Sequence, residues 1–173
     1  KVTYGDPLNP ATNVGPAISK GQRDGVVAKI EQAKADGARL VVSGPLEGNV
    51  IAPHIFVDVD PASALAREET FGPVLPVIKA RDEAHALELA TDTEYGLSSA
   101  VYTRDIQRGV NFARQIVAGM THVNAITVGD HANAPFGGEK NSGLGRFNGE
   151  WIMEEFTRTH WITIHNEGPN FPF

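Results

Sequence analysis

The sequence contains no cysteine among its 173 residues. Such a chain forms no disulfide, offers no thiolate to a metal ion and supplies no thiol nucleophile. It also has no apolar run near the roughly 18 residues that a membrane-spanning helix requires. Residues 1–10 are polar and rich in turn formers, unlike a signal peptide. We therefore expect a cytoplasmic protein that does not enter a membrane.

An excess of positive charge is absent as well. The chain has 15 lysines and arginines against 21 aspartates and glutamates, a net charge of −6 with both signs interspersed. This balance argues against nucleic acid or an anionic membrane as a partner. A hydrophobic share of 41% over this length is ordinary for a globular protein with a sizeable core.

The order of periodic segments predicts an α/β fold. Ser19 suits a helix N-cap and Gly37 a helix end, and two short strands, 39–43 and 55–58, then flank a Gly/Pro-rich loop. Further along we expect strand 73–79, helix 82–91, strand 98–103, helix 105–117 and strand 120–124. Strands that alternate with helices predict βαβ units and a parallel sheet. The apolar runs 74–78 and 100–102 predict strands buried on both faces.

The last quarter of the chain has a different character. Residues 134–148 are glycine-rich and predict a loop, residues 150–156 a short helix, and residues 160–165 a strand. The abrupt, turn-rich start of the chain suggests that part of the protein precedes residue 1.

Three stretches have residues that are able to bind a ligand. Glu68 and Glu69 stand beside Phe71 and a Gly-Pro turn, where a carboxylate has the chemistry to accept two ribose hydroxyls; a plain acidic loop is the alternative that residue types alone favour. Residues 143–149 resemble a dinucleotide-binding loop in composition, but the spacing is not G-x-G-x-x-G, and a structural loop is favoured. Asn124 ends a predicted parallel strand, where ligands bind in such sheets, although a hydrogen-bond anchor is the commoner role. The six histidines show no metal-ligand spacing.

Taken together and in order, these stretches resemble the aldehyde dehydrogenase superfamily. Residues 68–73, Glu-Glu-Thr-Phe-Gly-Pro, match the family motif E-E-x-F-G-P, and residues 135–146 resemble its P-F-G-G-x-K-x-S-G-x-G-R block. Gly5-Asp6-Pro7 with Gly15-Pro16, Tyr95-Gly96-Leu97 and Val123-Asn124 are further matches. The resemblance spans residues 4–165.

The resemblance implies a role for particular residues. Glu69 would bind the nicotinamide-ribose hydroxyls, and Phe71 would pack beside the nicotinamide. Asn124, Ala125, Ile126, Thr127 and Phe136 would contact the aldehyde. Some relatives have an acidic residue where Arg158 stands, paired with the arginine that matches Arg146; Glu150 or Glu155 would then replace it here.

The resemblance also implies a domain plan and an activity. Residues 1–148 would be the C-terminal part of the catalytic domain, 149–165 a helix and an oligomerisation strand, and 166–173 a tail. The enzyme would oxidise an aldehyde, with an aromatic or other bulky apolar one expected, to a carboxylic acid with NAD or NADP, as a homodimer or homotetramer. Its nucleophilic cysteine would precede residue 1, so no catalytic residue lies in this chain, which by itself is expected to be inactive and not to bind the cofactor. The alternatives are a non-catalytic binding or assembly module and an unrelated α/β domain.

Overall fold

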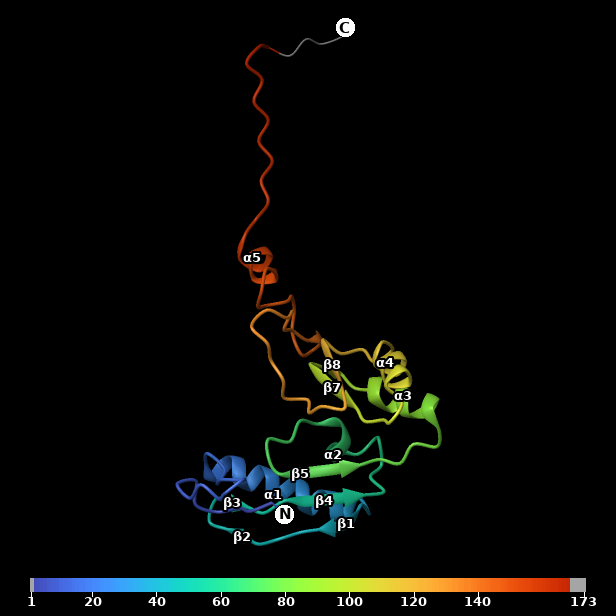
Figure 1. Ribbon diagram of the computed structural model, residues 1–173. Helices are drawn as coiled ribbons and strands as arrows, with labels where there is room; N and C mark the ends of the chain where they lie inside the picture. Colours follow the sequence, from blue (N-terminus) through green and yellow to red (C-terminus); the bar gives the residue numbers. More distant parts are fainter. Residues whose placement is uncertain (1, 169–173) are drawn as a thin grey trace. The chain divides into compact units, whose positions relative to one another are not determined.

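The computed structural model of the protein describes residues 2–168, so only the first part of the expected tail, 166–173, falls among the described residues. The chain divides into two units, Lys1–Leu89 and Ala90–Phe173, and the boundary falls within helix α3 (Glu83–Thr91) (Figure 1). The domain plan expected from the resemblance (1–148, 149–165 and 166–173) remains a prediction, because the division into two units reflects only how the chain packs.

Helix α1 (Lys20–Ala35) begins and ends where the sequence predicts. Ser19 is the N-cap residue, and its side chain accepts a hydrogen bond from the backbone N–H of Gln22. After the helix, Gly37 has φ +85, a left-handed conformation that glycine adopts at little cost.

The first unit contains a three-stranded sheet in the order β1 (Arg39–Val42), β4 (His54–Val57), β5 (Val74–Val77). Strands β1 and β4 are antiparallel, and β4 and β5 are parallel and connected through the short helix α2 (Ala64–Arg67). Between β1 and β4, the predicted loop contains a small hairpin, β2 (Leu46–Glu47) and β3 (Val50–Ile51), that turns at Gly48 with φ +56.

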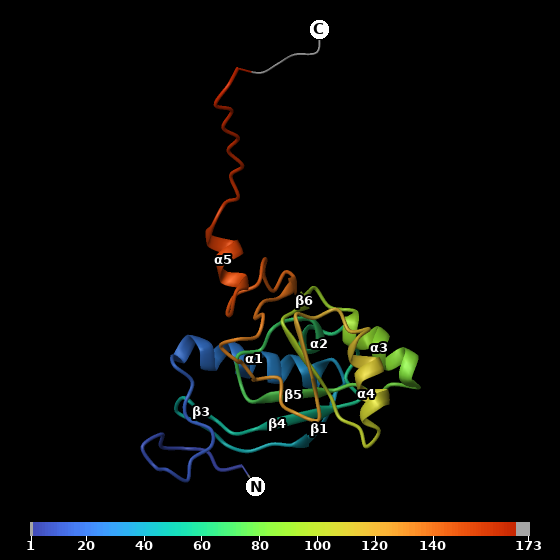
Figure 2. The ribbon, with the colours of Figure 1, turned by 45° about the horizontal axis from the view of Figure 1, so that its top comes forward.

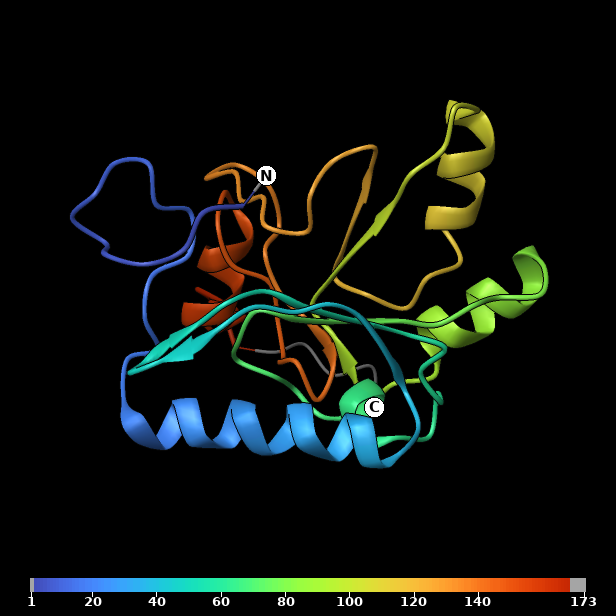
Figure 3. The same cartoon turned by 90° about the horizontal axis from the view of Figure 1, so that it is seen from below.

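Helix α1 lies along one face of this sheet (Figure 3). Its buried residues Val26, Ile30 and Ala33 belong to one apolar cluster with Phe56 of β4 and Val74 of β5. Phe56 and Ile30 are fully buried, and side chains of that size each stabilise a fold by about 1.5–3 kcal/mol when buried. This packing fixes α1 beside the segment that leads into β5.

The second unit contains the parallel pair β7 (Ser98–Val101) and β8 (Met120–Val123), joined by α4 (Ile106–Ala113) (Figure 1). A second pair, β6 (Tyr95–Gly96) and β9 (Glu139–Lys140), is antiparallel. The short helix α5 (Trp151–Phe156) follows the glycine-rich loop. Parallel strands linked by helices confirm the expected α/β class.

Each unit contains one parallel pair, β4 with β5 and β7 with β8. One expectation, that of burial on both faces, is wrong. Leu75 and Val77 of β5 and Tyr102 after β7 are exposed, at 55%, 41% and 67%. An apolar run indicates a strand that is stable when both faces are buried. Among the described residues, no segment of the same unit packs on the second face.

Residues 157–168 form no helix or strand and are exposed (Figure 2). The strand expected at 160–165 would pair with a different segment or subunit, so the single chain does not test it. None of the described helices is both long and apolar enough to cross a membrane.

Candidate functional site

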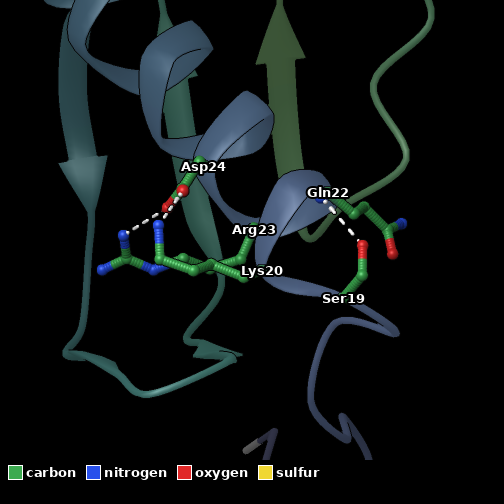
Figure 4. Close-up of polar contacts among 5 residues, drawn as sticks. All are labelled: Ser19, Lys20, Gln22, Arg23 and Asp24. Atoms are coloured by element: carbon green, nitrogen blue, oxygen red, sulfur yellow. Dashed lines mark hydrogen bonds and ion pairs between the residues drawn. The ribbon is translucent and has the colours of Figure 1, made fainter.

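The start of α1 is built around Gln22 (Figure 4). Its backbone N–H donates to Ser19 Oγ at 3.1 Å, and its side-chain oxygen accepts from the N–H of Ile18 at 3.1 Å. The Ser19-x-x-Gln22 spacing resembles a capping box. In that motif, the side chains of the N-cap residue and of the third helical residue each accept a hydrogen bond from the other's backbone N–H. The remaining group of Gln22, Nε2, donates to the carbonyl of Phe71 at 2.8 Å. One side chain therefore closes the helix cap and holds the predicted cofactor loop.

A second residue of α1 reaches the same loop. Lys29 Nζ donates to the carbonyl oxygen of Glu69 at 2.6 Å and lies 3.4 Å from Glu68 Oε2. The loop between α2 and β5 is thus attached to α1 at two backbone carbonyls, those of Glu69 and Phe71.

The predicted cofactor-binding side chains are exposed. Among the described residues, the Glu69 carboxylate has no hydrogen-bond or ion-pair partner, and Phe71 is 67% exposed. A cavity of about 170 Å³ adjoins both, lined by Gln22, Gly25, Val26, Lys29, Glu69, Thr70 and Phe71. A second cavity of about 170 Å³ lies against Phe71 and Gly72 on one side and residues 15–18 on the other. A free carboxylate beside a free aromatic ring is an arrangement that can bind a hydroxylated ring compound.

Two neighbours of Phe71 show how tightly this loop is placed. A Cβ atom at Gly72 would lie 2.7 Å from a methyl carbon of Val26, so a side chain there requires α1 to move. Among the described residues, the buried hydroxyl of Thr70 has no hydrogen-bond partner. A buried polar group without a partner is uncommon in a folded protein.

The charges at the start of α1 are arranged around Asp24 (Figure 4). Lys20 donates to one carboxylate oxygen at 2.6 Å and Arg23 to the other at 2.8 Å. These bonds, that of Lys20 first, hold the pKa of Asp24 below its ordinary range, against a smaller opposing effect of burial.

In the second unit, Asn124 is an anchor between strands. It has φ +57, its side-chain oxygen accepts from the N–H of Thr103 at 2.8 Å, and its Nδ2 donates to the carbonyl of Thr103 at 2.8 Å. The amide side chain thereby extends the pairing of β7 with β8 by one residue. This geometry matches the hydrogen-bond anchor that the sequence left as an alternative, whereas its contact with substrate stays untested.

The other predicted wall residues follow Asn124 on an exposed loop. Ala125, Ile126 and Thr127 are all exposed, Ile126 by 66%. The loop is tied back where Ser98 Oγ donates to the carbonyl of Thr127 at 2.8 Å. Apolar side chains in this position are free to contact a ligand.

Phe136 is held separately, at the start of the glycine-rich loop. It exchanges two backbone hydrogen bonds with Phe147, of 2.9 and 2.7 Å, which close the loop at its base. Further along, Lys140 Nζ donates to the carbonyls of Thr91 and Thr93, and Ser142 Oγ accepts from the N–H of Gly96. The loop folds onto its own unit, where the ammonium group of Lys140 and the backbone N–H groups of Asn141 and Ser142 have protein partners, which supports a structural role.

Arg146 is the centre of this loop. Its Nη1 donates to the carbonyls of Gly138 at 3.0 Å and Gly145 at 2.9 Å, and its Nη2 pairs with Glu139. Glu155 accepts from the backbone N–H of Arg146 at 2.9 Å. Of the two glutamates expected to replace the acidic partner, Glu155 does contact Arg146, but at the backbone N–H of Arg146. The guanidinium group pairs instead with Glu139, which the sequence analysis did not identify.

Gln22 and Lys29 were also missed as parts of the site. Their contacts with Phe71 and Glu69 span 49 and 40 residues of sequence, so no local pattern reveals them. The Ser19-x-x-Gln22 spacing indicates the helix cap, but it gives no sign of the bond from Gln22 to the carbonyl of Phe71.

Comparison with known proteins accounts for this arrangement. The chain matches the model of the aldehyde dehydrogenase family over residues 1–162. It is 53% identical to a vanillin dehydrogenase of Corynebacterium glutamicum over 163 residues, 94% of this chain and 34% of that protein. It is 47% identical to the benzaldehyde dehydrogenase YfmT of Bacillus subtilis over 169 residues, 98% of this chain and 35% of that protein.

Solved structures agree. A salicylaldehyde dehydrogenase from Pseudomonas putida G7, complexed with salicylaldehyde, superposes with a TM-score of 0.93 at 37% identity, covering 100% of this chain and 36% of that one. An aldehyde dehydrogenase of Mycobacterium tuberculosis, complexed with NAD+, gives a TM-score of 0.85 at 40% identity, covering 91% and 33%. The chain spans about a third of the length of the curated relatives it matches. It belongs to the aldehyde dehydrogenase family.

Proposed function

We propose that the enzyme carrying this chain oxidises an aromatic aldehyde to the carboxylic acid with NAD or NADP. The observation that carries the substrate class is the 53% identity, over 94% of this chain, to a protein named for vanillin. Relatives named for benzaldehyde and salicylaldehyde, both also aromatic, add support. In the net reaction the aldehyde gains the oxygen of water and loses a hydride.

The residues of the 68–73 loop fit the cofactor. The carboxylate of Glu69 is exposed and has no partner among residues 2–168, so both its oxygens can accept hydrogen bonds from the two ribose hydroxyls. The ring of Phe71 offers an exposed apolar surface beside them. When bound, NAD(P) supplies the hydride acceptor, and Glu69 and Phe71 position one end of it.

Ile126 and Phe136 fit an aromatic aldehyde. Ile126 is 66% exposed on its loop, and Phe136 has a backbone fixed by two hydrogen bonds. Contact between two aromatic rings is worth about 0.5–1.5 kcal/mol beyond burial.

Oxidation of an aldehyde through a thiolate requires a cysteine, and this chain has none. The chain alone is therefore expected to give no NAD(P)H with any aldehyde, in preparations free of host dehydrogenases. The catalytic residues of the proposed enzyme would lie outside these 173 residues.

The test is a comparison of kcat/KM for vanillin, benzaldehyde and acetaldehyde, with NAD+ and with NADP+, in the complete enzyme. We expect benzaldehyde or vanillin to exceed acetaldehyde by at least about ten-fold, the factor that about 1.4 kcal/mol provides. Preference for acetaldehyde would contradict the substrate class. No turnover of any aldehyde by a folded complete protein would favour the non-catalytic binding module instead.

Assembly and location are part of the same proposal. Residues 156–165 are rich in β-branched and aromatic residues and contain no Pro or Gly, which suits an intersubunit strand of a cytoplasmic homodimer or homotetramer. Light scattering with and without residues 157–173 tests the assembly, and a complete enzyme of unchanged mass after their removal would refute it. Fractionation of cells tests the location.

A further inference from the structure

We propose that Lys29 is a positioning residue for cofactor binding, which holds the backbone of Glu69 and compensates the charge of Glu68. This inference rests on the proposed function, because it assigns to Lys29 the placement of the carboxylate that binds ribose.

The contacts of Lys29 single it out among the lysines of α1. Its side chain is 24% exposed, against 84% for Lys20 and 43% for Lys34, which make ion pairs within their own helix. Lys29 instead reaches off the helix, to the carbonyl of Glu69 at 2.6 Å and to the carboxylate of Glu68 at 3.4 Å. Burying an ammonium group to this degree is favourable only with such partners.

The bond to Glu69 lies between two other attachments of the loop, the end of α2 and the bond from Gln22 to the carbonyl of Phe71. Helix α2 ends at Arg67, and β5 does not begin until Val74. In the described part of the chain, the bond from Lys29 is the only hydrogen bond that Glu69 makes. Without it, the peptide that carries the Glu69 carboxylate loses its one direct hydrogen bond in the described part of the chain.

The charge of Lys29 has a second effect. Glu68 and Glu69 are consecutive residues with carboxylate side chains, and neighbouring like charges repel each other. Lys29 pairs with Glu68 and not with the carboxylate of Glu69. The lysine thus reduces the repulsion and leaves the Glu69 oxygens unoccupied, which is the state that a ribose diol requires.

Lys29 also lines the cavity of about 170 Å³ beside Glu69, Thr70 and Phe71. It does so through its position on α1, whose buried face is fixed against the sheet by Val26 and Ile30. A rigid helix that presents a fixed donor to a loop lowers the number of loop conformations that compete with the binding one.

The experiment uses the complete enzyme with Lys29→Met, Lys29→Arg and the control Lys34→Met. The dissociation constant of the oxidised cofactor is measured by fluorescence titration without aldehyde, together with KM and kcat. We expect Lys29→Met to weaken cofactor binding roughly ten-fold, as for loss of a charge-assisted hydrogen bond, and Lys29→Arg to restore it to within about two-fold. Lys34→Met should bind like the wild type. Lys29→Gln gives the same test if Lys29→Met does not fold.

The double variant Lys29→Met with Glu69→Gln separates positioning from a general loss of stability. If Lys29 acts through Glu69, the double variant binds cofactor no more weakly than Glu69→Gln alone. Wild-type affinity in Lys29→Met, or losses that multiply in the double variant, would overturn the inference. Wild-type affinity in Glu69→Gln would instead overturn the cofactor role of Glu69 itself, so the two failures are distinguishable.

Discussion

Gly119 and Gly137 cross so closely that a Cβ atom at Gly119 would lie 1.7 Å from the carbonyl oxygen of Gly137. Gly119 precedes β8, and Gly137 belongs to the glycine-rich loop. The contact explains the glycine at position 119, because a side chain there would occupy the place of a loop carbonyl. Within the loop, a Cβ atom at Gly137 would lie 2.4 Å from the carbonyl oxygen of Gly145. These glycines therefore allow backbone to pack closely on backbone within the second unit.

The first prediction concerns this crossing. Gly119→Ala should lower the free energy of unfolding by about 1–3 kcal/mol or more, because the added methyl group forces the two backbone segments apart. Gly25→Ala is the matched control, since a Cβ atom there meets nothing within 4 Å in the middle of α1. It should raise stability by about 0.5–1 kcal/mol. The free energies of unfolding of both variants, measured by denaturant titration, test this prediction. Equal values would refute the close contact between Gly119 and Gly137.

Arg146 should stabilise the glycine-rich loop through its fixed fork of donors. Arg146→Met removes bonds to Gly138, Gly145 and Glu139, and we expect a loss of about 1–2 kcal/mol after allowance for partial exposure. Arg146→Lys should recover less than half, because an ammonium group does not reproduce the planar fork. Arg104→Met is the control, at an exposed arginine of the same unit outside any helix or strand. Thermal melts in which Arg146→Met equals Arg104→Met would contradict the assignment.

Asp24 should make the start of α1 sensitive to acid. Its pKa is lowered in the folded protein, chiefly by Lys20 and then by Arg23, so the carboxylate stabilises the fold above its unfolded pKa. That contribution is complete at neutral pH and is lost as pH falls below about 4. The difference in Tm between wild type and Asp24→Asn should therefore shrink on acidification, and also in high salt because the pair is exposed. A difference that is constant from pH 7 to pH 3 would be inconsistent with the ion pairs.

The wall residues should set the preference between aldehydes. In the complete enzyme, Ile126→Ala and Phe136→Ala should each lower kcat/KM for benzaldehyde about 2- to 10-fold more than for acetaldehyde, since only the aromatic substrate loses a ring or apolar contact. Val128→Ala, at an exposed residue of the same loop, should change both substrates equally. Equal losses for the two aldehydes in all three variants would remove Ile126 and Phe136 from the substrate wall.

Local signals predicted most elements of the fold. Ser19 and Gly37 bound α1, and Asp105 caps α4 by accepting from the N–H of Arg108, because caps depend on the residues next to them. The hairpin at residues 46–51 was missed, since its strands have only two residues each and a pattern of that length carries no period. Burial of β5 on both faces was predicted wrongly, because burial depends on what packs against a strand, which the strand's own sequence does not encode.

The candidate site divides in the same way. The motif resemblance located Glu69 and Phe71, and the structure places both beside one cavity. It did not reveal Gln22 or Lys29, whose contacts join segments 40 or more residues apart. Asn124 was identified by its place at a strand end, and its bonds to Thr103 depend on a strand pairing that only the fold provides.

The most direct test of the account is the effect of Glu69→Gln on the complete enzyme. Glu47→Gln, at an exposed glutamate of β2, is the control. Loss of a charge-assisted bond to ribose, about 1.5–3 kcal/mol, predicts that Glu69→Gln weakens cofactor binding or lowers kcat/KM for the cofactor by ten-fold or more with Tm unchanged. Kinetics identical to the wild type across all cofactor concentrations would contradict the claim that residues 68–73 form one edge of the cofactor site.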